Sequence, residues 1–250
     1  MKEQFNPYSL KGKKILVTGA SSGIGRATAI VCSKMGAEVI ITGRNYERLL
    51  ETNEQMDNSD IQLISTDLST EEGIKVLLNT LPKLDGIVLA AGIVDMIPIQ
   101  FAAPDKFQKI FQTNLFSPIE ILRQIIKKKN FNPGLSIVVI DSIAGNDDFV
   151  VGNSIYGAGK AAFKSFCKFF AIEMVGKHVR INTVSPGLIL TPMQRKSAVS
   201  EADLEAAISR VPMKRWGQPE EIAYAAVFLL SDASSYMTGA DIKIDGGYTI

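Results

Sequence analysis

Tyr156 and Lys160 are four residues apart in a segment with helical apolar spacing, and residues of these two types could carry acid–base chemistry. Side chains four residues apart on a helix lie on the same face, so the phenol and the ammonium can meet. A phenol has a pKa of about 10 and acts as a base near neutral pH only when a positive charge stabilises the phenolate. One ammonium about 5 Å away supplies roughly 3 kcal/mol at an effective dielectric constant of about 20. The pair is therefore a candidate general acid and base, although the same spacing is common as a surface contact.

A strand-like run over residues 14–18 leads directly into a glycine-rich turn, after which helical spacing begins. Glycines let the backbone turn tightly and approach a pyrophosphate, while free N–H groups at a helix start attract its negative charge. The spacing is T-G-x3-G-x-G, which differs from the six-residue G-x-G-x-x-G fingerprint, and by itself it could be only a tight connection. The residues expected to bind a dinucleotide here are Gly19, Ser21, Ser22, Gly23, Ile24 and Gly25.

These two motifs, together with others in a fixed order, make the chain similar to the short-chain dehydrogenase/reductase family. The resemblance covers nearly the whole chain. The further matches are Asp67, Ala91, Gly92, Asn114, Ser142, Asn182, Pro186, Gly187, Thr191 and the segments 215–221, 238–239 and 245–247. The resemblance implies an oxidoreductase that moves a hydride between a nicotinamide cofactor and a carbonyl carbon.

The resemblance also implies roles for four catalytic residues. Tyr156 would donate and accept the proton, and Lys160 would also hydrogen-bond the nicotinamide ribose. Ser142, after the fifth strand-like run, would bind and orient the substrate carbonyl, and Asn114 would hold a water that joins Lys160 to solvent. Reduction would then place a hydride on carbon and the Tyr156 proton on oxygen, and oxidation would follow the reverse path.

The residues after the second strand-like run indicate which nicotinamide cofactor binds. An NAD-selective site usually has Asp or Glu there, because a carboxylate holds the ribose hydroxyls and repels a 2′-phosphate. This chain has Gly43 and then Arg44, whose guanidinium could bind a 2′-phosphate with help from Ser21 and Ser22. We therefore expect NADP(H) rather than NAD(H). The alternative is that Arg44 is a solvated loop arginine.

Further cofactor contacts are implied after the third, fourth and sixth strand-like runs. They are Asp67, Leu68, Ala91, Gly92, Pro186, Gly187, Ile189 and Thr191, besides Tyr156 and Lys160. Asp67 resembles an aspartate that contacts adenine, but an aspartate at a strand end is equally often part of an Asx turn or a helix N-cap. Nothing in the sequence suggests a metal site, and His178 is its single histidine.

Two departures from the family pattern bear on the site. Residues 89–92 read L-A-A-G where the family commonly has N-N-A-G, so the side-chain hydrogen bonds of those asparagines are missing and support for the strand end is in doubt. Ser142 also lies one residue further from Tyr156 than is usual. We expect the loop over residues 145–155 to be slightly longer and to reshape the substrate mouth.

Seven short apolar, β-branched runs must position these residues. They are residues 14–18, 38–42, 61–65, 86–90, 136–140, 179–184 and 241–244. Helical segments, such as 26–35 and 219–230, separate them, which predicts a Rossmann-type, doubly wound α/β fold: a parallel sheet of about seven strands with helices on both faces. No linker divides the chain, so we expect one domain over residues 1–250, with a substrate lid around residues 187–213.

The composition argues against several classes of partner. With 27 basic and 26 acidic residues the net charge is +1, so no broad surface that would attract nucleic acid is expected. No apolar run approaches the roughly 18 residues of a spanning helix, so we expect no membrane partner and, by default, a cytoplasmic protein. The helix of Tyr156 is apolar on two sides, which resembles the family's helix-on-helix subunit interface and predicts a homodimer or homotetramer; the alternative is cover from the same chain.

The leading functional hypothesis is an NADP(H)-dependent carbonyl reductase or secondary-alcohol dehydrogenase. One alternative is a 3-oxoacyl-acyl-carrier-protein reductase, although Ile172 stands where those enzymes commonly have an arginine for the acidic carrier protein. A hydroxysteroid or sugar-alcohol dehydrogenase is another. A non-catalytic NADP-binding regulatory protein belongs to a different class, but it would usually have lost the tyrosine or the lysine, and this chain retains both.

Overall fold

Seven parallel strands form one sheet in the computed structural model, which describes residues 5–57, 61–193 and 201–250. In chain order they are β1 (Lys14–Thr18), β2 (Glu38–Gly43), β3 (Gln62–Ser65), β4 (Leu84–Leu89), β5 (Phe131–Ile140), β6 (Arg180–Pro186) and β7 (Asp241–Ile244). Their order across the sheet is β3-β2-β1-β4-β5-β6-β7, and each neighbouring pair is parallel. The doubly wound α/β fold predicted from the sequence is confirmed.

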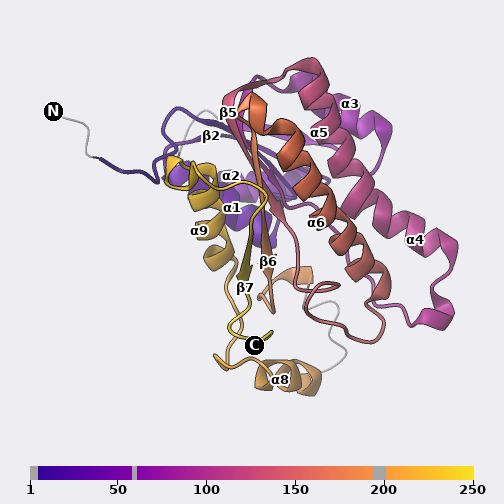
Figure 1. Ribbon diagram of the computed structural model, residues 1–250. Helices are drawn as coiled ribbons and strands as arrows, with labels where there is room; N and C mark the ends of the chain where they lie inside the picture. The colour runs from indigo at the N-terminus through magenta and orange to yellow at the C-terminus, as the bar shows by residue number, and fades with distance from the viewer. Residues whose placement is uncertain (1–4, 58–60, 194–200) are drawn as a thin grey trace.

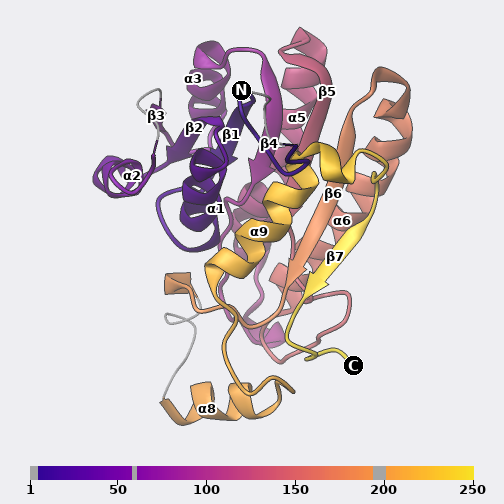
Figure 2. The ribbon, with the colours of Figure 1, turned by 90° about the vertical axis from the view of Figure 1, so that its left-hand side faces the viewer.

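Helices cover both faces of this sheet (Figure 1). The α-helices of the described residues are α1 (Gly23–Lys34), α2 (Tyr46–Asn53), α3 (Glu71–Thr80), α4 (Pro104–Phe111), α5 (Ser117–Lys128), α6 (Ser154–Met174), α8 (Glu201–Ser209), which lies away from the sheet faces, and α9 (Pro219–Leu230). Buried aliphatic side chains join α3, α5 and α6 to one face and α1, α2 and α9 to the other, so the sheet lies between two apolar cores. Figure 2 shows α1 and α9 in front of the sheet. Within the described residues, no helix combines the length and apolarity needed to cross a membrane.

The β5 strand differs from its predicted extent. It begins at Phe131, whereas the sequence predicted residue 136. Phe131 pairs with Leu84 across an irregularity in the register between β4 and β5, and the Asn132 amide donates to Asp85 at 2.8 Å. Pairing with the neighbouring strand thus extends β5 through a Pro-Gly segment that by itself favours a turn.

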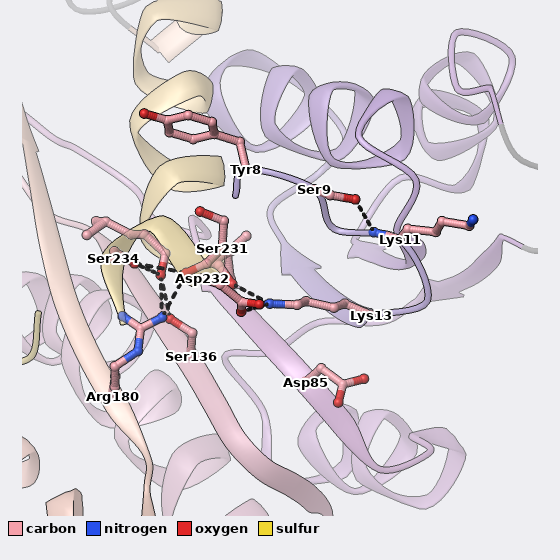
Figure 3. Close-up of polar contacts among 12 residues, drawn as sticks. Tyr8, Ser9, Lys11, Lys13, Asp85, Ser136, Arg180, Ser231, Asp232 and Ser234 are labelled. Atoms are coloured by element: carbon pink, nitrogen blue, oxygen red, sulfur yellow. Dashed lines mark hydrogen bonds and ion pairs between the residues drawn. The ribbon is translucent and has the colours of Figure 1, made fainter. Parts of the chain in front are cut away.

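Polar contacts fasten the C-terminal end of α9 to the amino-terminal edge of the sheet (Figure 3). The guanidinium of Arg180, at the start of β6, donates to the carbonyl oxygens of Leu229 at 3.0 Å and Ser231 at 3.3 Å. Lys13, just before β1, pairs with Asp232 at 2.7 Å. Cations are favourable at the negative end of a helix dipole. This edge is the one opposite the carboxyl ends of the strands.

The predicted lid lies partly outside the described residues, which omit 194–200. Its described part includes α8, which lies beyond the carboxyl ends of the strands in both views (Figures 1 and 2). Val211, after α8, is buried and lies close to Gly246 near the C-terminus. The segment is therefore anchored where it returns to the body of the protein.

Candidate active site

A cavity of about 730 Å³ opens at the carboxyl ends of the strands, around the point where the strand order reverses between β1 and β4. Open α/β sheets bind ligands at this point. The structure places these predicted cofactor-binding residues along its wall: Gly19, Ser21, Ser22, Gly23, Ile24, Gly25, Arg44, Asp67, Leu68, Ala91, Gly92, Tyr156, Lys160, Pro186, Gly187, Ile189 and Thr191. Ser142 also lines it, while Asn114 lines a smaller neighbouring cavity with Lys160.

The glycine-rich turn between β1 and α1 has no room for side chains at two of its glycines. A Cβ on Gly25 would collide with the carbonyl oxygen of Gly19, and one on Gly19 would lie 2.8 Å from the backbone of Ala91. Gly19 also has a φ of 68°, in the left-handed region. In this fully described turn the Ser22 side chain does not cap α1. The first N–H groups of α1 therefore face the cavity end without a side-chain acceptor, which suits a pyrophosphate.

Thr18 supports the end of β4, where the family's asparagines are missing. Its hydroxyl oxygen accepts from the N–H groups of Ala90 and Ala91, each at 3.1 Å, and the hydroxyl lies 3.4 Å from the Val88 carbonyl oxygen as a donor. A buried threonine on β1 thus holds the backbone that the sequence left in doubt.

Arg44 and Asp67 lie at the end of the cavity formed by β2 and β3. Arg44 is exposed and lines the cavity. The Asp67 carboxylate accepts from the N–H and hydroxyl of Ser69, at 2.9 and 2.7 Å, so it forms an Asx turn, and the N-cap of α3 is Thr70. The Ser69 N–H and hydroxyl and the Arg44 charge all act to hold the pKa of Asp67 below its usual range. Asp67 thus forms the Asx turn that the sequence allowed and also lies on the cavity wall.

Tyr156 and Lys160 meet in the first turns of α6, as their spacing predicted. The Lys160 ammonium lies 5.7 Å from the centre of the Tyr156 ring. Lys160 is only 6% exposed, and its Nζ donates to the carbonyl oxygen of Ile140, at the end of β5, at 2.7 Å. This hydrogen bond fixes the buried cation between its helix and the sheet.

Ser142 reaches the same part of the cavity from the loop after β5. Its Oγ accepts from the Ala144 N–H at 3.0 Å, which leaves the hydroxyl proton free to point elsewhere. Gly145 has a φ of 82°, and a Cβ there would collide with the carbonyl of Gly157 in α6. The loop of Ser142 therefore lies directly on the helix of Tyr156.

Asn114 lies in a π-helical turn, η2 (Gln112–Phe116), between α4 and α5. Its side chain is buried, accepts from the Ile93 N–H at 2.9 Å and donates to the Ile93 carbonyl at 2.8 Å. Asn114 therefore ties the chain after β4 to the α4–α5 junction. Wide π-turns of this kind are frequent at functional sites.

Three residues that were not among the predicted site residues lie together at the mouth of the cavity, although the sequence indicates Asp148 as a solvated turn residue that could border the substrate. The Arg210 guanidinium lies 4.7 Å from the centre of the Tyr248 ring and 3.9 Å from the Asp148 carboxylate. Burial, with the nearby Asp148 charge, raises the pKa of Tyr248. No local pattern links residues 148, 210 and 248, so only the assembled fold reveals this group.

A second omission is Asp141, which directly precedes Ser142. It is 3% exposed, and burial raises its pKa to about 6. The available signal was a carboxylate at the end of an otherwise apolar strand, in the order I-D-S.

Three comparisons bear on this arrangement. A family model described as enoyl-(acyl carrier protein) reductase matches residues 19–249. The 3-oxoacyl-[acyl-carrier-protein] reductase FabG of Rickettsia felis is 37% identical in an alignment of 240 residues that covers 95% of this chain and 97% of that protein. The glucose 1-dehydrogenase of Gluconobacter oxydans is 30% identical, over 98% of this chain and 95% of that protein. The solved RhlG/NADP active-site complex of Pseudomonas aeruginosa has a TM-score of 0.89 at 32% identity, covering 98% of this chain and 100% of that chain.

The named relatives act on different substrates, but all are reductases or dehydrogenases, and their matches extend over nearly the whole chain. They support an enzyme acting on an alcohol or carbonyl group. The resemblance carried by the glycine-rich turn and by Tyr156 and Lys160 is confirmed: the chain belongs to the short-chain dehydrogenase/reductase family.

Proposed function

We propose that this protein is an NADP(H)-dependent oxidoreductase that interconverts a carbonyl compound and a secondary alcohol. The observation that carries the proposal is the convergence of Tyr156, Lys160 and Ser142 beside a cavity that also contains the glycine-rich turn. When bound there, the nicotinamide supplies or accepts the hydride. The protein's own part is to orient the carbonyl group and to move the proton.

Ser142 and Tyr156 would hold the carbonyl oxygen. The Ser142 hydroxyl, which accepts from Ala144, keeps its proton for donation to that oxygen, and the Tyr156 phenol supplies the proton that completes reduction. Lys160 stabilises the phenolate that remains, because its ammonium lies 5.7 Å from the ring centre and is shielded from bulk water. In the alcohol-oxidising direction the same phenolate removes the hydroxyl proton.

The proton of Tyr156 would be replaced through Lys160 and a water near Asn114. A cavity of about 20 Å³ lies between these two residues and neighbouring apolar side chains. Its volume exceeds the roughly 10–15 Å³ that one water requires. Because the Asn114 side chain is bound to Ile93, its role would be to shape this space and fix the adjacent backbone.

Arg44 supports NADP(H) as the cofactor. It follows Gly43, and a Cβ at Gly43 would lie 3.2 Å from the Ser21 hydroxyl, so this corner has hydroxyl and guanidinium donors and little room for a carboxylate side chain at residue 43. A 2′-phosphate suits such donors. The relative RhlG, solved with NADP, supports the same choice.

A 3-oxoacyl thioester on a carrier protein is the second candidate substrate, favoured by the names of the most similar relatives. Apolar side chains of the cavity would suit an acyl chain: Val94, Met96, Val150, Leu188, Met193 and Trp216. Against it, Ile172 on α6 is 75% exposed and offers an acidic carrier no positive charge. Comparing one 3-oxoacyl group on a carrier protein and on a small thiol tests this candidate, since a carrier-dependent enzyme has the higher kcat/KM with the former.

NADPH oxidation with a panel of ketones, aldehydes, 3-oxoacyl thioesters and sugars tests the proposed function. At least one compound should be reduced, and Tyr156→Phe should lower kcat by about 100-fold to 10,000-fold, because the phenol proton is lost. NADPH binding, followed by cofactor fluorescence, should persist in Tyr156→Phe. No turnover with the panel, or an unchanged kcat in the variant, would contradict the proposal.

We also propose that α6 mediates assembly into a homodimer or homotetramer. Its outer side exposes Phe169 and Ile172, and Val175 directly after it is exposed as well, while its inner side packs on the sheet. Burial of such side chains favours association, and two-fold symmetry lets the same patch serve both subunits. Residues 187–193 and 201–213 remain, in this proposal, parts of a lid within one domain.

A further inference from the structure

Asp141 is a buried carboxylate whose oxygens lack well-aligned hydrogen-bond donors. It is 3% exposed, and among the described residues neither carboxylate oxygen has a well-aligned hydrogen-bond partner; the neighbouring Ser142 N–H only helps to lower its pKa. Its backbone N–H continues the sheet by donating to the Val184 carbonyl at 2.8 Å. A buried, ionised carboxylate without hydrogen bonds is unfavourable unless opposite charge lies nearby. The position therefore requires an explanation beyond packing.

The side chain of Asp141 faces α6. Side chains alternate along a strand, and the preceding members of its row, Ile137 and Val139, pack in the same core as Phe163 and Cys167 of α6. The charges that stabilise ionised Asp141 also lie on α6, since they belong to Lys160 and Lys164, and this supports a side chain that points toward α6.

Asp241, on β7, already neutralises Lys164. The Lys164 ammonium lies 2.7 Å from one Asp241 oxygen and 3.2 Å from the Ser185 hydroxyl, and the other Asp241 oxygen accepts from Thr183 and Ser185. Asp241 repels Asp141, and burial raises the pKa of the Cys167 thiol, which stays neutral. Of the two described cations that act on Asp141, the one without a carboxylate partner of its own is Lys160, whose Nζ donates to the carbonyl of the preceding residue, Ile140.

We propose that Asp141 is a positioning residue whose carboxylate balances part of the Lys160 charge, so that its protonation state governs how readily Tyr156 loses its proton. This inference rests on the proposed function, in which Tyr156 is the acid and base. An ionised Asp141 reduces the positive charge available to the phenolate, and a protonated Asp141 restores it. No proton passes through Asp141 in this scheme, since it acts only through its charge.

Burial supports this assignment, because it raises the pKa of Asp141 to about 6 and so brings its titration near neutral pH. The carboxylate would then be ionised above neutral pH. Removing its charge should stabilise the phenolate, and one charge about 10 Å away at an effective dielectric constant of about 20 contributes roughly 1.7 kcal/mol, which corresponds to about one pH unit.

The test titrates Tyr156 by its phenolate absorbance in cofactor-free protein. Subtracting the curve of the matching Tyr156→Phe protein isolates this phenol from the other five tyrosines among the six in the chain. In Asp141→Asn the midpoint should fall by about one pH unit. Asp141→Ser provides the same loss of charge with a smaller side chain and should behave likewise.

Asp147→Asn is the matched control. Asp147 is in the same loop, is exposed and pairs with Lys243 at 3.1 Å, so water and salt screen its charge and its loss should leave the midpoint unchanged. The proposal is overturned if either folded Asp141 variant titrates like the wild type or at higher pH, or if Asp147→Asn shifts the midpoint equally. Because no turnover is required, an inactive protein whose Tyr156 still shifts contradicts the proposed function alone.

In the wild type, infrared spectroscopy provides a second measurement, of the protonation state of the Asp141 carboxyl group. A protonated-carboxyl band that disappears as the pH rises through about 6, and that Asp141→Ser lacks, supports the proposal. A wild-type spectrum without such a band at pH values of about 5 overturns it, because Asp141 would then stay ionised throughout.

Discussion

Arg44 is the residue on which the proposed choice between NADPH and NADH depends. It is exposed at the cavity wall beside Asp67, a place where a 2′-phosphate would lie. Arg44→Gln should raise the dissociation constant of NADPH by about tenfold to a hundredfold, because a hydrogen bond to a charged group contributes roughly 1.5–3 kcal/mol. The dissociation constant of NADH should hardly change. Arg48→Gln, an exposed arginine of α2, is the control in fluorescence titrations, and equal effects of both variants would contradict a 2′-phosphate contact.

Asp141 also links stability to pH. Burial raises its pKa in the folded protein from 3.8 to about 6, so between these pH values the folded state binds more protons than the unfolded state. Stability is therefore lost as the pH rises through this window, by roughly 3 kcal/mol if the full shift is realised. Asp141→Asn lacks this contribution, so the free energy of unfolding of the variant, relative to that of the wild type, should increase as the pH rises from about 4 to 7. Urea denaturation measures the difference, and parallel pH curves would contradict it.

At the scale of an element, the turn between β1 and α1 depends on glycine. Gly25→Ala introduces a Cβ that collides with the Gly19 carbonyl, so either the turn or the start of α1 must move. We expect a loss of about 1–3 kcal/mol in stability and weaker NADPH binding. Gly176→Ala is the matched control, because a Cβ there meets nothing within 4 Å. Thermal melts and cofactor titrations that fail to separate the two variants would refute this account.

The sequence predicted well those elements whose signals are local. Tyr156 and Lys160 meet because four residues make one helical turn, and α9 matches its predicted range because Pro219 and a capping box define its start. The residues it missed depend on distant partners. Thr18 supports the β4 end from another strand, and Asp141 acquires its environment only when β5 and α6 pack together. Such roles require the assembled sheet and cannot be inferred from spacing along the chain.

At the scale of the whole molecule, the outer side of α6 is the part most suited to a second subunit. Ile172→Glu would place a charge in the middle of an apolar patch that includes Phe169 at 66% exposure, so it should shift an oligomer toward the monomer. Val76→Glu is the control, because Val76 is an exposed aliphatic residue on a different helix, α3, at 40% exposure against 75% for Ile172. Sedimentation velocity measures both proteins, and an unchanged mass for Ile172→Glu would exclude α6 as the interface.

The Arg180 and Lys13 contacts have a consequence for how this protein could change its substrate. They tie the end of α9 to β6 and β1 at the amino-terminal edge of the sheet, whereas Ser142 and α8 lie at the carboxyl ends of the strands. The contacts that hold this edge together are therefore separate from those that shape the cavity. Segments around the cavity can therefore be exchanged between related enzymes while the contacts of Arg180 and Lys13 stay intact. Evolution, or a protein engineer, can change the substrate specificity of the enzyme without changing the contacts that stabilise the opposite edge of its sheet.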